Sequence, residues 1–186
     1  MEFGMWGRRR VKRVGIVSTR LAGTDGVSLE SDKWVHVMEE RRLTCYYFAG
    51  ELDRPPERSY LAEEAHFNHP EIQEIQKASF GVTTRSRSLT GKIQEIKRKL
   101  KDDLYSFISK YKIDLLMPEN SLTIPMNIPL GLAITEVIAE TGMPARAHHH
   151  DFYWERDRFS INAVSDYLNM SFPPNLPTLT HTVINK

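Results

Sequence analysis

A recurrent alternation between short β-branched or aromatic runs and segments of helical periodicity constrains the fold of this chain more than any other feature. The first unit contains a predicted strand at 13–18, a glycine-containing loop, a predicted helix at 27–42 and a second strand at 43–49. Two parallel strands need a crossover helix of about this length, so the unit has the size of a βαβ motif. We therefore expect a sheet that is mainly parallel.

The same alternation continues along the rest of the chain. Apolar residues spaced three or four apart predict a long amphipathic helix at 93–111. Further strands are predicted at 113–117, 145–148 and 180–185, and further helices at 70–78 and 128–140. The remainder of 51–90 is irregular. These elements predict an α/β fold, a three-layer Rossmann-like sandwich with a mainly parallel sheet.

The composition excludes several classes of protein. Lys and Arg number 25 against 24 Asp and Glu, and this net charge of +1 argues against a dedicated nucleic-acid binder. Cys45 is the only cysteine, which excludes an intrachain disulfide and any site with two Cys ligands.

No apolar run approaches the ~18 residues of a membrane span, and we expect a cytoplasmic protein. The 40% of apolar residues suffices for a core, to which we assign Trp34 and Met38.

The first residues of the chain form a separate region. Five basic residues fall between Arg8 and Arg13, and no long apolar stretch follows them, so they do not form a signal peptide. We interpret residues 1–12 as a flexible, solvated tail, with a patch for an anionic surface as the alternative. Residues 13–186 are then predicted to form a single Rossmann-like lobe.

A glycine-containing loop follows the first predicted strand, at the edge where open parallel sheets bind their ligands. Gly23 and Gly26 lie three residues apart, with Thr24 and Asp25 between them, directly before a helix. The loop is interpreted either as a backbone cradle for an anion, with positive φ at Gly26, or as a flexible turn. It matches neither the G-x-G-x-x-G fingerprint nor a P-loop, which argues against a dinucleotide-dependent dehydrogenase.

Polar residues also follow the strand predicted at 113–117. Glu119 and Asn120 come directly after Pro118. A carboxylate and an amide at a strand end either hydrogen-bond sugar hydroxyls or cap a neighbouring helix, and the sequence leaves both open.

Three consecutive histidines follow the next predicted strand. On a strand only His148 and His150 share a side, and the other histidines of the chain have no matching spacing, so we predict no metal site. The histidines are either buried and hydrogen-bonded or face a ligand. Asp151 and the aromatic Trp154 nearby favour a ligand such as a sugar, because rings stack on sugars and carboxylates bind hydroxyls.

Two segments together carry a resemblance to a known family. Residues 14–30 resemble the opening strand and loop of retaining glycosyltransferases with two Rossmann-like lobes, the GT-B architecture of family 4 type, and residues 148–156 resemble their strand-end histidine segment. The resemblance implies an amino-terminal, acceptor-side lobe. It places Gly23 and Gly26 near the donor phosphates and the transferred sugar.

The same resemblance implies roles for the histidine segment. His150, followed by Asp151, lies near the transferred sugar, with His149 behind it, and no residue acts as a nucleophile. The donor is a nucleotide-diphosphate sugar, so no other cofactor is implied.

The expected function is therefore hexose transfer from a nucleotide-activated sugar to an acceptor. The resemblance places the nucleotide-sugar site in a second lobe, for which no residues remain after 180–186. We expect a weakly active or inactive lobe when alone, completed by a partner lobe or a second copy. The alternative is a non-catalytic module that binds sugars or nucleotides or dimerises.

Overall fold

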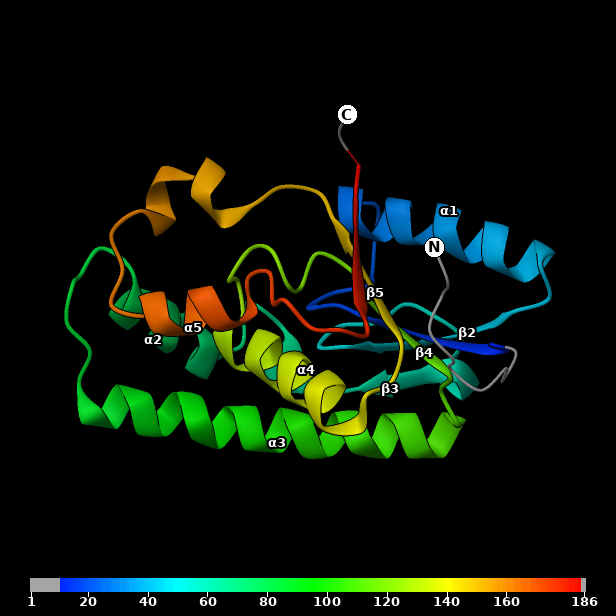
Figure 1. The fold of residues 1–186 in the computed structure, drawn as a ribbon, viewed down its shortest axis with the longest axis horizontal. Coiled ribbons are helices and arrows are strands. Elements are labelled where there is room, and N and C mark those ends of the chain that lie inside the picture. Colours follow the sequence, from blue (N-terminus) through cyan, green and yellow to red (C-terminus); the bar gives the residue numbers. More distant parts are fainter. Residues whose placement is uncertain (1–10, 185–186) are drawn as a thin grey trace.

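A computed structural model describes residues 11–184. It confirms the α/β prediction, because helices flank a six-stranded sheet in which all neighbouring strands are parallel, in the order β3-β2-β1-β4-β5-β6 (Figure 1). The strands are β1 (Arg13–Val17), β2 (Thr44–Ala49), β3 (Ser59–Leu61), β4 (Leu115–Pro118), β5 (Ala145–His149) and β6 (Leu179–Val183). The predicted basic tail lies outside the described residues, apart from its last two residues.

The helices lie on both faces of the sheet. Figure 1 shows α1 on one face and α3 and α4 on the other, which gives the three-layer sandwich. The α-helices are α1 (Gly26–Glu40), α2 (Pro70–Ser79), α3 (Arg87–Tyr111), α4 (Ile128–Thr141) and α5 (Ser165–Ser171). Four 3₁₀ turns are present in the described chain: η1 (Pro56–Arg58), η2 (Glu63–Ala65), η3 (Tyr153–Glu155) and η4 (Asp157–Phe159).

The central strand β1 is buried on both faces. Val14 and Ile16 pack under α1, whereas Val17 belongs to the larger core on the opposite face. Gly15 points toward that larger core, where a Cβ atom would lie 2.7 Å from Cε1 of Phe107. A glycine at this position therefore lets α3 pack directly against β1.

Helix α3 shows how the apolar pattern defines an element. Ser86 caps its first turn by accepting a hydrogen bond from the Leu89 amide, and Lys112 ends it in the left-handed conformation at φ 53°. Its apolar stripe is buried, as predicted. The helix begins six residues before the predicted start, because the prediction began the stripe at Ile93, whereas the buried Leu89 lies one turn earlier on the same stripe.

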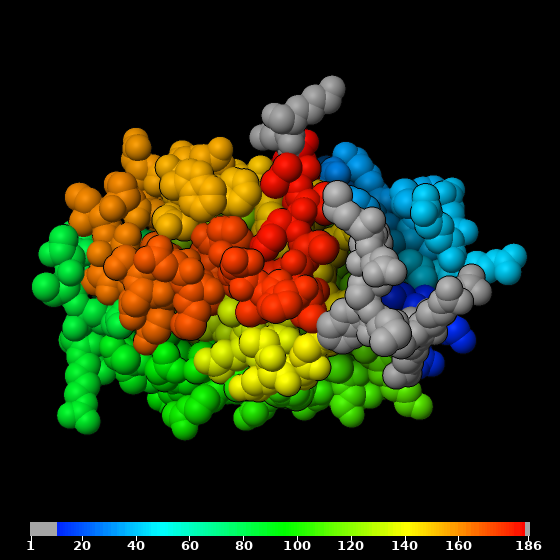
Figure 2. Space-filling model, viewed as in Figure 1, coloured from blue at the N-terminus to red at the C-terminus, as the bar shows by residue number. Residues whose placement is uncertain are grey.

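The largest difference from the sequence prediction is at one edge of the sheet. The three-residue strand β3 lies in the region that we predicted to be irregular and pairs with β2. At the opposite edge, β6 lies at the surface together with α5 (red and orange in Figure 2).

Among the described residues, no helix has both the length and the hydropathy that a bilayer crossing requires.

Candidate functional site

A cavity of about 490 Å³ opens at the carboxyl ends of the strands. Its walls come from the loop after β1, the start of α1, the segments after β4 and β5, and the loop before α2. The lining residues are Ser18, Thr19, Arg20, Asp25, Val27, Phe67, Asn120, Met126 and Arg156. Open parallel sheets bind ligands at this edge, and the cavity is therefore the candidate site.

Hydrogen bonds hold the segments after β1, β4 and β5 against one another. The Glu119 amide donates to the Val17 carbonyl at 2.8 Å, and the Ser18 hydroxyl donates to the Glu119 carbonyl at 3.0 Å. The Asn120 amide donates to the carbonyl of His148 at 2.8 Å. The glycine-containing loop and the histidine segment thus lie at the same edge of the sheet, as the sequence predicts.

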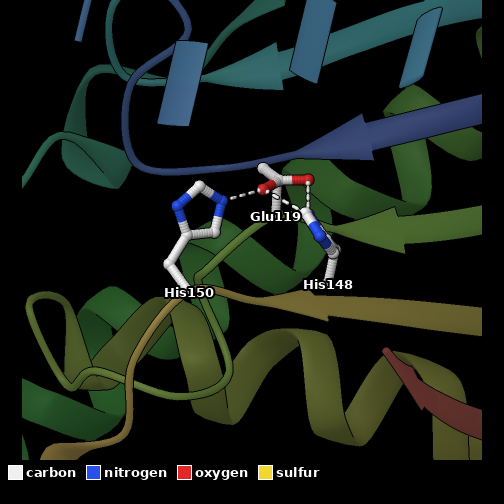
Figure 3. A group of neighbouring side chains, drawn as sticks. All are labelled: Glu119, His148 and His150. Carbon is white, nitrogen blue, oxygen red and sulfur yellow. Dashed lines mark hydrogen bonds and ion pairs between the residues drawn. The ribbon is translucent and has the colours of Figure 1, made fainter. Parts of the chain in front are cut away.

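Glu119, His148 and His150 form a cluster at this edge (Figure 3). The Glu119 side chain is fully buried, and both its oxygens lie near His148 Nδ1, at 2.8 and 3.0 Å. Oxygen Oε1 also lies 2.6 Å from Nε2 of His150. One buried carboxylate therefore binds two imidazole rings. These belong to His148 in β5 and to His150 directly after the strand, two positions that share one side of it.

The hydrogen bond to Glu119 changes the protonation of His150. It raises the pKa of the His150 imidazole, against an opposing effect of burial, and the charges of Glu119, Glu30 and Asp151 act in the same direction as the hydrogen bond. Because the imidazolium form is favoured, His150 can offer a charge-assisted N–H to a ligand.

The same three side chains offer one potential metal-ligand atom each, and these atoms lie within 4.8 Å of one another. The prediction of no metal site considered only histidine spacing and did not include Glu119. The hydrogen bonds do not suit a metal. Trp34 Nε1 lies 3.4 Å from His148 Nε2, and an indole N–H only donates, so the His148 proton lies on Nδ1, the atom that would have to bind the metal.

His149 lies on the other side of β5 and does not reach the cavity. Its side chain is buried beside His181 of β6, with Nε2 2.7 Å from Nδ1 of His181, whose Nε2 donates to the Pro174 carbonyl at 3.0 Å. Burial, together with the nearby His181, lowers the pKa of His149 to about 3. The ring is therefore neutral and structural in this conformation, away from the face that holds His150.

The structure places positive φ at Gly23, at 74°, and not at Gly26. The expectation for Gly26 was wrong because α1 begins at this residue, earlier than predicted, and a helical residue has negative φ. The Gly23 amide donates to Asp53 at 2.6 Å, and Asp25 caps the first amides of α1. The loop amides are thus largely bound within the protein. Thr24 lies exposed beside them.

The remaining candidates occupy distinct positions. Asn120 adopts the left-handed conformation at φ 53° and accepts from the His150 amide through Oδ1 at 3.2 Å, so it supports the histidine segment and also lines the cavity. Asp151 pairs with Arg156, which lines the cavity as well. Trp154 is 59% exposed and stacks on Phe152, outside the lining.

Sequence reasoning missed three residues of this region. Trp34 was assigned to the core, but its indole is only half-buried and reaches His148. Arg20 and Arg156 line the cavity, each paired with carboxylates. Arg20 lies two residues after the strand predicted at 13–18, and Arg156 lies in the segment that follows the strand predicted at 145–148, which is a positional signal that could have identified them. No sequence signal separates Trp34 from a core residue.

Comparison with known proteins supplies a second line of information. The chain is 30% identical over 178 residues to the mannosylglucosylglycerate synthase of Petrotoga mobilis, covering 92% of this chain. It is 27% identical over 177 residues to the enzyme of that name from Thermotoga maritima, covering 93% of this chain. No family model matches the chain, and no solved structure matches it. The chain is thus similar to two glycosyltransferases and spans 40% of the length of each.

Proposed function

We propose that the chain is the acceptor-side lobe of a retaining glycosyltransferase with the two-lobed GT-B architecture of family 4 type. The enzyme transfers a hexose from a nucleotide-diphosphate sugar to an acceptor hydroxyl, and this lobe forms one wall of the cleft. Similarity over almost the whole chain to two mannosylglucosylglycerate synthases supports this reaction class. The observation that carries the proposal is the meeting of the β1 loop, Glu119 and His150 beside one cavity.

The chemistry of the cavity suits a hydroxylated ligand. The Ser18 hydroxyl, the Asp25 carboxylate and the Asn120 amide all lie in its wall, and each can exchange hydrogen bonds with sugar hydroxyls. The Gly23 amide is bound by Asp53 and is not available to an anion. These contacts support a sugar, more than a diphosphate, as the group that this part of the wall meets.

Around this cavity we assign further contacts to the sugars. His150 donates from its imidazolium to a sugar oxygen, and Asp151 beside it accepts from a hydroxyl. The exposed ring of Trp154 offers a flat surface on which a pyranose can stack. None of these residues is proposed as a nucleophile.

The proposed reaction breaks the bond between the anomeric carbon and the donor phosphate and forms a bond from that carbon to the acceptor oxygen. The acceptor proton leaves with the departing diphosphate, so retention requires no base from this lobe. What the lobe supplies is the position and orientation of the acceptor. Stabilisation of the leaving diphosphate belongs to the second lobe in this proposal.

The names of the two relatives give the first substrates to test: a mannosyl donor and glucosylglycerate as acceptor. We test acceptor binding by adding glucosylglycerate to the ¹⁵N-labelled chain and following amide chemical shifts. The expected shifts centre on Thr19, Asn120 and His150. Binding should weaken at least fivefold in Asn120→Ala and remain unchanged in Glu39→Gln, a surface control.

Shifts confined to other parts of the molecule, or no binding at millimolar acceptor, would refute the proposed site. Binding at the cavity without transfer, once a second lobe is supplied, would favour the alternative of a non-catalytic sugar-binding module.

A further inference from the structure

Trp34 lies on α1, far in sequence from the histidine segment, yet its indole ring meets His148 edge-on. The two ring centroids are 5.3 Å apart at an interplanar angle of 70°, and Nε1 lies 3.4 Å from Nε2 of His148. An indole N–H can only donate. Nε2 of His148 must therefore keep its lone pair, because a proton there would place two donors face to face.

This constraint determines the charge of His148. With Nε2 unprotonated, the His148 proton lies on Nδ1 and is donated to Glu119, and the ring is neutral. The His148 side chain is 3% exposed, so water does not offer an alternative partner for a second proton. His148 therefore orients the Glu119 carboxylate without neutralising it.

The negative charge of Glu119 is then balanced by His150 alone among the two histidines. Nε2 of His150 donates to Oε1 of the carboxylate at 2.6 Å. The second ring nitrogen, Nδ1, has no protein partner among the described residues and points away from Glu119 (Figure 3). The rings of His148 and His150 lie only 5.2 Å apart, so two imidazolium charges would repel each other here.

We propose that Trp34, His148 and Glu119 are positioning residues that place the single positive charge of the cluster on His150, with its Nδ1–H turned toward a substrate oxygen. This inference rests on the proposed function for the identity of that oxygen, which belongs to a sugar or to its phosphate. The charged groups that face His150 are Glu119 from the segment after β4 and Glu30 from α1, with Asp151 following in the chain.

The test is an NMR titration of the ¹⁵N-histidine-labelled full chain between pH 5 and 9, which reports the proton on each ring nitrogen and requires no substrate. In the wild-type protein, His150 should titrate above the ordinary histidine value, and the neutral ring of His148 should carry its proton on Nδ1. Trp34→Phe keeps an aromatic ring and removes the N–H. In this variant no donor faces Nε2 of His148, so a proton there is no longer opposed, and the apparent pKa of His150 should fall by about one unit.

Two further variants complete the test. Trp154→Phe removes an exposed indole and should leave both titrations unchanged. Glu119→Gln should lower the apparent pKa of His150 by about one unit or more, because the charged partner is lost. Should the buried Glu119→Gln variant not fold, the Trp34→Phe result decides alone.

A wild-type His148 with its proton on Nε2, or identical titrations in wild type and Trp34→Phe, would overturn the inference. Stoichiometric binding of Zn²⁺ that abolishes the titration would also overturn it, since it would make the cluster a metal site. Failure of sugar transfer alongside the expected titrations would instead refute the proposed function and leave the charge assignment intact.

Discussion

The buried ring of His149 makes the stability of the protein depend on pH in a way that can be calculated. The folded chain holds this ring neutral, with a pKa of about 3, whereas an unfolded histidine titrates near 6.5. Between these values the unfolded state binds more protons, so the free energy of unfolding rises with pH and falls on acidification. A pH of 5 is about 1.5 pH units below the pKa of the unfolded histidine, and each unit corresponds to about 1.36 kcal/mol of unfolding free energy. The expected loss from pH 7 to pH 5 is therefore about 2 kcal/mol.

A comparison of wild type with His149→Gln isolates this contribution. Glutamine keeps a donor that can reach His181 but has no titrating ring. His150 acts in the opposite sense: the hydrogen bond to Glu119 raises its pKa, so its stabilisation is present below pH 6.5 and is lost as pH rises through the folded value. That contribution is common to both proteins and cancels in the difference.

The assay is urea unfolding at pH 7 and pH 5, followed by circular dichroism. Wild type should lose about 2 kcal/mol more than His149→Gln between the two pH values, whatever the variant loses at pH 7. Equal losses in the two proteins would show that the ring is accessible to protons in the folded state, which would contradict its burial beside His181.

Substitutions at four positions test the packing and the loop, each by urea unfolding. Gly15→Ala should cost about 1–3 kcal/mol, because the new Cβ would lie 2.7 Å from Phe107, and an unchanged midpoint would mean that α3 packs farther from β1. Gly23→Ala should cost about 1–2 kcal/mol at φ 74°, whereas Gly26→Ala, with open space around the helical position, should be neutral or slightly stabilising. The reverse order would contradict the backbone assignment. Asp25→Ala should cost about 1 kcal/mol through the lost cap of α1, and Asp25→Ser should restore most of it; equal costs would exclude capping.

Much of the fold could be predicted from the sequence because the pattern of burial is local. The long helix is defined by an apolar stripe that every turn repeats, and four of the six strands are rich in β-branched or apolar residues and are bounded by loops. Strand β3 is different: it has only three residues, of which none is buried, so no pattern in the sequence distinguishes it from a loop. Its existence depends on pairing with β2, which is a tertiary contact.

The sequence predicted those residues of the candidate site whose location follows from their position directly after a strand. The rule that ligands bind at the carboxyl ends of parallel strands brought the Gly23–Gly26 loop and the His148–His150 segment together. The alternation of side chains along β5 correctly predicted that His149 points to the opposite side of the strand from His148 and His150. The partner of those neighbours was not predictable, because Glu119 reaches them through the register of β4 and β5, and Trp34 through the rotation of α1.

The most direct test of the account is sugar transfer. The chain is mixed with the part of the Petrotoga mobilis synthase that it does not cover, and a mannosyl donor and glucosylglycerate are added. We expect a mannosylated product only when both polypeptides are present, with a rate at least tenfold lower for His150→Ala although the variant lobe remains folded. The same rate with His150→Ala would contradict the role of the strand-end cluster, and product formation without the chain would contradict its role as a lobe of the enzyme.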